Sequence, residues 1–447
     1  MTRATPLLAA VLALGAVAPA GAQEPEPPSP VAFWNAVGDS TLRRLVAEAV
    51  EGSPDVQVAL ARVSGARADR FGSALDFAPT ITAIGGYTRT RYAAANIPGA
   101  TSAAPDLDLW DAGLQLTWEL DLFGRLRRNY AGQGALLASA REDLRDVQVL
   151  LAAEVAAAWF DLLGAEERLA VARGNAENQQ RTLDLTLTRL EAGRGNAFDT
   201  ERARAQLSTT LSAVPALETA VAALRHRIGV LVGRPPAAVA AELTAAPRLP
   251  TLPESLVVAN PDSLLRLRPD VRSAERQLAA RKAFVGSAKA EYLPRLSLEG
   301  SAGYTGTTFD SLGEEPTGRY AIGPVISWPA LNLGRVKARV DLARAGEAEA
   351  GARYTQAILR AEEEVETALV SYRKAQERLA RLGESAGASE RAAEFARLRF
   401  VEGASDFLQV LDAERTLLEA QDRLASGRAD AATALVGVYR ALGGAGI

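Results

Sequence analysis

The sequence of 447 residues contains no cysteine, one histidine and one methionine. The lack of cysteine excludes disulfides, thiolate metal ligands and cysteine nucleophiles, and a single histidine cannot build a multi-histidine metal centre. Charges are nearly balanced, since 50 basic and 54 acidic residues give a net charge of −4, which does not favour nucleic-acid binding. From these absences we expect no enzyme activity, no cofactor, no bound metal and no nucleic-acid partner.

Aromatic residues are also scarce, at 6% of the chain, whereas hydrophobic residues as a whole make up 48%. Many of the latter are alanine, a strong helix former whose small side chain lets helices approach closely. The length exceeds that of one ordinary domain. The composition therefore favours long, closely packed helices, in two domains or in one elongated repetitive architecture.

The first residues have the pattern of an export signal. Arg3 precedes a short apolar run over 7–17, and small residues at 20–22 suit a signal peptidase. We predict a signal peptide over 1–22, cleaved after Ala22, and an extended segment rich in proline over 23–40. The apolar run is too short to span a bilayer, and no other stretch is expected to form a membrane-spanning helix. Without cysteine, the exported chain cannot be lipidated on a mature N-terminal cysteine.

The chain contains two copies of one unit. Rare or punctuating residues recur at a spacing of about 215 early in each copy and of about 210 later, which is the pattern expected of a duplication. The matching pairs include Pro54 with Pro269, Trp118 with Trp328, Gly193 with Gly403 and Gly233 with Gly443. We place the copies at 41–232 and 263–447, joined by a connector over 233–262.

Each copy has the pattern helix, strand, strand, helix, helix. Alternating apolar and polar residues predict strands over 79–90, 110–121, 294–305 and 319–329. Each strand pair precedes a long helical hairpin, over 124–232 and 334–442, whose first helix contains no proline and would be about 100 Å long. Glycines at 193 and 403 end these first helices, and Asn196 and Ser405 are the expected N-caps of the returning ones.

The four strands have one apolar face, one polar face and aromatic residues near their ends, as outer-membrane strands do. Four strands cannot close a barrel, and open edges cannot be left in lipid. Three chains would supply twelve strands, so a homotrimer is expected. The predicted fold class is an α+β membrane protein whose trimeric β-barrel continues into an α-helical coiled-coil barrel. The predicted aromatic edge facing the lipid comprises Tyr87, Trp110, Trp118, Tyr304, Tyr320 and Trp328.

Several motifs together resemble those of TolC-type outer-membrane efflux proteins, in particular the branch that serves resistance-nodulation-division pumps. They are WELDLFG at 118–124 with its echo WPALNLG at 328–334, LRHRIGVLVGRP at 224–235 and GASDFLQVLDAE at 403–414. The resemblance extends over essentially the whole chain after the signal peptide. It implies a trimeric exit duct in the outer membrane, with the helical barrel crossing the periplasm to a periplasmic adaptor (membrane fusion) protein and an inner-membrane pump. It also implies an equatorial region, in which the connector over 233–262 would lie.

The same resemblance assigns roles at the ends of the hairpins, which are farthest from the strands. It implies that Asp412 lines a periplasmic gate and that Asp199 takes part in closing it. At two further gate positions the family's acidic and basic residues are replaced by Gln409 and Ser405. The implied adaptor contacts are the two tips, Gly193, Arg194, Gly195 and Asn196 in the first hairpin and Gly403, Ala404, Ser405 and Asp406 in the second.

Other functions are compatible with parts of the sequence. A similar duct could serve type I protein secretion, and a trimeric surface adhesin also builds a twelve-stranded barrel from three chains. The adhesin, however, would carry its four strands together at the C-terminus, whereas here they form two separated pairs. A periplasmic coiled-coil scaffold would have no membrane-facing strands, and no two acids are convincingly paired for an exported carboxylate hydrolase.

Overall fold

The computed structural model describes residues 32–91, 93, 106–243, 249–253 and 265–444. The predicted signal peptide lies outside the described residues, as do parts of the predicted N-terminal segment and connector. In chain order the helices are α1 (Ala32–Val37), α2 (Ser40–Gly52), α3 (Pro54–Leu75), α4 (Arg125–Glu191), α5 (Ala197–Leu231), α6 (Pro236–Glu242), α8 (Pro269–Ala290), α9 (Leu333–Val401) and α10 (Phe407–Ala441). The strands are β1 (Thr80–Thr90), β2 (Leu107–Leu120), β3 (Arg295–Gly306) and β4 (Gly318–Ser327).

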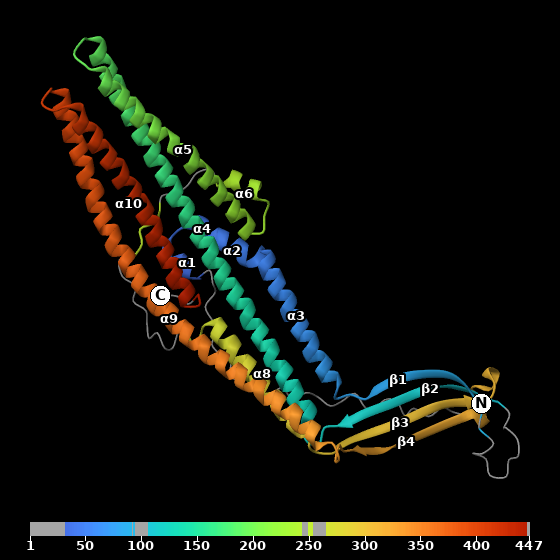
Figure 1. The fold of residues 1–447 in the computed structure, drawn as a ribbon. Helices are drawn as coiled ribbons and strands as arrows, with labels where there is room; N and C mark the ends of the chain where they lie inside the picture. Colours follow the sequence, from blue (N-terminus) through green and yellow to red (C-terminus); the bar gives the residue numbers. More distant parts are fainter. Residues whose placement is uncertain (1–31, 92, 94–105, 244–248, 254–264, 445–447) are drawn as a thin grey trace.

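The internal repeat is visible in the structure as two matching series of elements. Helices α3 and α8 both have 22 residues, α5 and α10 both have 35, and the long helices α4 and α9 have 67 and 69. The two hairpins, α4 with α5 and α9 with α10, extend together away from the sheet (Figure 1). Their turns are therefore at the opposite end of the molecule from the strands.

The prediction of an extended segment over 23–40 is wrong for the part that the structure describes. Residues 32–37 form helix α1, and Asp39 caps helix α2 through its carboxylate. Phe33 and Trp34 are buried, and their rings lie 4.9 and 4.8 Å from the ring of Tyr439 in α10. The helix forms because these two aromatic side chains pack into the core, an effect that the proline-rich sequence before them does not reveal.

The four strands form one antiparallel sheet in the order β1-β2-β3-β4. The register places Tyr87 opposite Trp110, Trp110 opposite Gly306, and Tyr304 opposite Gly318. Because side chains alternate between faces, one face of the sheet is apolar and aromatic, apart from the Arg89–Asp108 ion pair at its outer end. The other face carries mostly Thr, Ser, Gly, Gln and charged residues.

The residues of the predicted aromatic edge lie in two groups. Tyr87, Trp110, Tyr304 and Tyr320 share the apolar face in the outer half of the sheet, and the Tyr87 and Trp110 rings are 4.6 Å apart. Trp118 is near the helical end of β2, and Trp328 follows the last residue of β4.

The two tryptophans at the helical end make equivalent hydrogen bonds. Trp118 donates its ring N–H to the Phe77 carbonyl at 2.8 Å, and Trp328 donates to the Tyr292 carbonyl at 3.0 Å. Phe77 and Tyr292 are themselves matching positions of the repeat. Each copy thus fixes its strand pair to the end of its preceding helix in the same way.

Helix α4 is the centre of the helical part and contacts α3, α5, α8 and α10. Its alanine-rich middle packs with α2 and α10 in the main core, where Trp159 and Phe160 are almost fully buried. By length and composition alone, α4 and α5 each contain a stretch apolar enough to cross a membrane, which the sequence interpretation did not foresee. In α4 67% of that stretch is buried within this chain, but in α5 only 17% is, so most of the apolar stretch of α5 is not covered within the protomer.

Candidate functional site

The tips of the two hairpins are built by the same glycine turn. Gly193 and Gly403 have φ of 67° and 76°, a left-handed conformation that glycine adopts without strain. After each glycine the next N–H reaches back to the last helical turn, from Arg194 to the Arg189 carbonyl at 2.9 Å and from Ala404 to the Arg399 carbonyl at 2.8 Å. This pattern satisfies carbonyls at the helix end and reverses the chain within a few residues.

The returning helices begin with different caps. Asn196 caps α5 by accepting from the Phe198 N–H at 2.6 Å, as the sequence predicted. In the second hairpin the predicted cap, Ser405, is wrong, because Asp406 caps α10 by accepting from the Gln409 N–H at 3.2 Å. The Ser405 hydroxyl is buried without a hydrogen-bond partner among the described residues. A carboxylate at the N-terminus of a helix also interacts favourably with the helix dipole, which the hydroxyl of Ser405 cannot do.

The predicted gate residues occupy the first turns of the returning helices. Asp199 lies in the first turn of α5 and is half-buried. Gln409 and Asp412 lie near the start of α10 and are exposed, and the Asp412 carboxylate accepts from Arg415 at 3.1 Å. Within one protomer, therefore, the Asp412 charge is screened by solvent and by one neighbouring arginine on its own helix.

The tip surfaces combine polar turn residues with exposed apolar side chains. All the predicted contact residues of the tips are exposed except Ser405, which is intermediate. Beside them Phe198, Val401 and Leu408 are each more than half exposed. Large apolar side chains that gather at one end of a molecule are typical of a binding surface.

The two hairpins meet along a row of polar residues on α4 that the sequence interpretation missed. The row recurs at every seventh position, and each member hydrogen-bonds across to the second hairpin. Seven residues make two turns of a helix in a coiled coil, so all five side chains face the same neighbour. The pairs are Asp161 with Thr433 (3.4 Å), Arg168 with Asp422 (2.7 Å), Asn175 with Gln421 (2.8 Å), Thr182 with Glu414 (3.0 Å) and Arg189 with the carbonyls of Phe400 and Val401 (2.9 and 3.0 Å).

Two members of this heptad row have shifted pKa values. Burial raises the pKa of Asp161 above its ordinary value, an effect that the hydrogen bond from Thr433 only partly opposes. The bidentate contact with Asp422 raises the pKa of Arg168, which therefore stays charged. The heptad spacing of these polar residues is present in the sequence, but α4 carries many other polar residues, so neither the row nor its partners stand out without the structure.

Arg189 is the last residue of the heptad row and lies next to the tip. Its guanidinium donates to two carbonyls in the last turn of α9 and lies 4.2 Å from the centre of the Phe400 ring. The last carbonyls of a helix have no partner within the helix, so an arginine from the neighbouring hairpin supplies one. Arg399 is the matching residue of the second copy, and it donates instead to the Ala404 carbonyl of its own turn at 3.4 Å.

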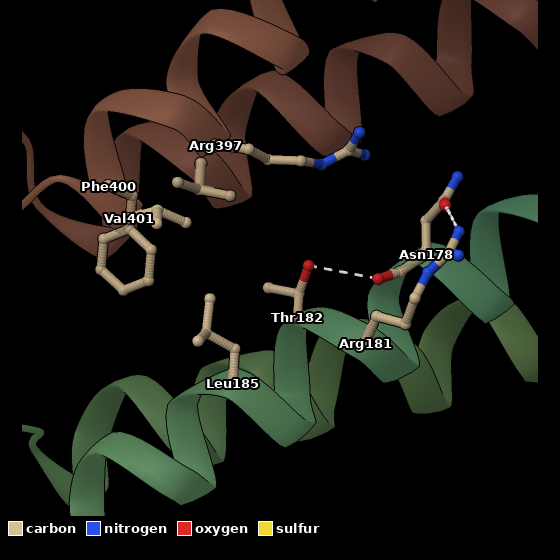
Figure 2. A pocket seen from close by; sticks show the side chains of 8 residues that line it. Asn178, Arg181, Thr182, Leu185, Arg397, Phe400 and Val401 are labelled. Atoms are coloured by element: carbon tan, nitrogen blue, oxygen red, sulfur yellow. Dashed lines mark hydrogen bonds between the residues drawn. The ribbon is translucent and has the colours of Figure 1, made fainter.

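A buried carboxylate lies just below this arginine. Glu414 is 2% exposed, and it accepts from Thr182 on α4 and from Arg397 on α9, the latter at 2.8 Å. Next to it a cavity of about 300 Å³ separates α4 from α9, lined by Asn178, Arg181, Leu185 and Phe400 among others (Figure 2). Near their tips the hairpins are thus joined by polar contacts and by an apolar cluster that includes Leu183, Phe400 and Phe407, with an incompletely filled space beside them.

No group of histidine, cysteine and carboxylate residues that could hold a metal ion occurs in the described ranges.

Comparison with known proteins supplies the family context. A family model described as "Outer membrane efflux protein" matches residues 45–234 and 260–444. The chain is 30% identical to the pyoverdine export outer membrane protein OpmQ of Pseudomonas aeruginosa, over 92% of this chain and 87% of that protein. It is 29% identical to nodulation protein T of Rhizobium leguminosarum bv. viciae, over 88% of this chain and 80% of that protein.

Solved structures agree with these sequence matches. The outer-membrane channel OprN is 39% identical and superposes with a TM-score of 0.85, and the match covers 94% of both chains. The outer membrane protein VceC of Vibrio cholerae is only 23% identical but has the same fold, with a TM-score of 0.83 over 94% of this chain and 100% of that one.

Proposed function

The chain belongs to the outer membrane efflux protein family, and because it is the outer-membrane exit duct of a tripartite efflux pump, we propose that its hairpin tips form the gated end of that duct. The duct is a homotrimer that works with a periplasmic adaptor protein and an inner-membrane pump. Transport through it is passive, since energy comes from the pump. We propose that the chain catalyses no reaction.

The adaptor is proposed to dock on the two tips, residues 193–196 and 403–406. The observation that supports this is the exposure of Phe198, Val401 and Leu408 beside two glycine turns at the end of the molecule farthest from the sheet. Exposed aromatic and aliphatic side chains flanked by polar turns provide an apolar centre with a polar rim, as protein interfaces do.

The gate is proposed to consist of Asp412 and Asp199, with Gln409 reducing its negative charge. In a trimer Asp412 is present three times at one level, and a ring of carboxylates in a narrow pore favours cations. The heptad row, and Arg189 above all, is proposed to hold the two hairpins of each protomer together while the tip is closed. Opening of the tip then requires the hydrogen bonds of the heptad row to break and new contacts to form in their place.

The gate assignment is tested by recording single trimers of Asp412→Asn in planar bilayers. We expect a lower preference for cations over anions than in the wild-type channel. Asp69→Asn, a matched change on α3 near the sheet, should leave the selectivity as it is. If the conductance and selectivity of Asp412→Asn match those of the wild type, the assignment is wrong.

For export and anchoring we propose the same arrangement that the sequence predicts. We propose that the signal peptide over 1–22 is removed and that the barrel alone anchors the chain in the outer membrane, without a lipidated cysteine. We further propose a resistance-nodulation-division pump as the inner-membrane partner. OpmQ is named for pyoverdine export, and small molecules or ions are the proposed substrates here. The comparisons favour efflux over the type I secretion, adhesin and scaffold alternatives.

A further inference from the structure

The polar face of the sheet carries five charged side chains within the described strands. They are Asp111 and Glu119 on β2, Arg295 and Glu299 on β3, and Arg319 on β4. The opposite face, apolar apart from the Arg89–Asp108 pair at its outer end, contacts lipid in the trimeric barrel, so these five side chains face the water-filled interior. Their pairing decides which charge an ion passing through the barrel meets.

Four of the five are compensated by a neighbouring opposite charge. Asp111 binds Arg319 at 2.5 Å and also accepts from Thr305 at 2.8 Å. Glu119 receives two hydrogen bonds from Arg125, at 2.9 and 2.7 Å. Arg295 lies 3.8 Å from Glu291.

Glu299 is different. It is exposed, and in the part of the chain that the structure describes it has no ion-pair or hydrogen-bond partner. The register places Thr117 opposite it on β2 and Gly323 opposite it on β4, with Thr80 completing the same row on β1. No basic side chain and no bulky side chain therefore stands beside this carboxylate.

We propose that three copies of Glu299, one from each protomer, form a ring inside the β-barrel that selects cationic solutes. The inference rests on the trimeric duct, because one protomer supplies only one of the three carboxylates. Such a ring lowers the energy of cations and raises that of anions at its level of the pore. The duct then has a charge filter in the outer membrane that is separate from the tip.

The test is the reversal potential of single trimers under a salt gradient around 0.1 M, where charges act over about 10 Å. Glu299→Gln should move the reversal potential toward zero, and Glu299→Lys should move it further, toward anion preference. Both shifts should also occur in an Asp412→Asn background, where the tip charge is removed. At 1 M salt, where the screening length is about 3 Å, the shifts should shrink.

Glu314→Gln, the same chemical change in the connection between β3 and β4, is the control and should leave the reversal potential unchanged. Trimers resistant to detergent confirm that each variant is assembled. If the Glu299 variants conduct with wild-type reversal potentials, the filter is refuted while the duct stands. If the wild-type trimer itself forms no channel, both the duct and the filter fail.

Discussion

At the scale of single residues, duplication has produced pairs of matching side chains that now do different things. Arg189 and Arg399 occupy the same place in the last turn of their long helices. Arg189 binds two carbonyls of the other hairpin and stacks on Phe400, whereas Arg399 donates a hydrogen bond to the Ala404 carbonyl of its own turn. Such divergence turns a symmetric repeat into a protomer whose two hairpins have distinct surfaces.

This difference gives a matched pair of variants. Arg189→Ala should weaken the attachment between the hairpin tips and raise the conductance of the closed trimer in planar bilayers. A hydrogen bond from a charged group contributes about 1.5–3 kcal/mol, and Arg189→Ala removes two such bonds in each protomer. Arg399→Ala should leave the closed conductance near that of the wild type. Equal conductance in both variants would show that Arg189 does not hold the tip.

At the scale of elements, the contact between α4 and α10 depends on how closely the two helices approach. A Cβ atom added at Gly164 would lie 2.5 Å from the Cβ of Ala429, closer than real Cβ contacts allow. A Cβ added at Gly174 would meet nothing within 4 Å, although both glycines are in the middle of α4. The heptad row runs along this same interface, so its hydrogen bonds require the close approach.

We therefore expect two Gly→Ala changes in α4 to have opposite effects on the stability of the protein. Gly164→Ala should force α4 and α10 apart and destabilise the protein by about 1–3 kcal/mol, as overpacking does. Gly174→Ala should stabilise it by about 0.5–1 kcal/mol, because alanine loses less conformational freedom in a helix. Thermal denaturation of the purified trimers measures both. A stabilising Gly164→Ala would contradict the close crossing.

At the scale of the whole molecule, the sheet is incomplete in one protomer. Strands β1 and β4 are the two edges, and each presents unpaired N–H and C=O groups. Lipid offers these groups no partners, so the edges must pair between copies. In the helical part, most of the apolar stretch of α5 is not buried within the protomer, so it also requires contacts with another copy.

Because the natural chain has no cysteine, edge pairing can be tested by introduced cysteines without background. Thr82→Cys on β1 is combined in turn with Ala321→Cys, Gly323→Cys or Val325→Cys on β4, all on the polar face. One combination should give covalent trimers on oxidation, since disulfides need Cα atoms about 4.4–6.8 Å apart. Reductant should return them to monomers on denaturing gels. Single variants should not cross-link, and the absence of trimers in all three combinations would contradict β1–β4 pairing.

The sequence by itself determined the repeated elements and the positions of the turns, because these follow from local periodicity and from glycine and proline. The strand β2, for example, alternates apolar and polar residues along its whole predicted range. Only the tertiary structure determined that residues 32–37 are helical and that Ser405 does not cap α10. It also determined the hydrogen-bond partners of Glu414 and of the heptad row. Their conformations and partners depend on side chains more than a hundred positions away or on competition within a turn. Local pattern carries no information about which distant group a buried polar side chain meets, and only packing supplies it.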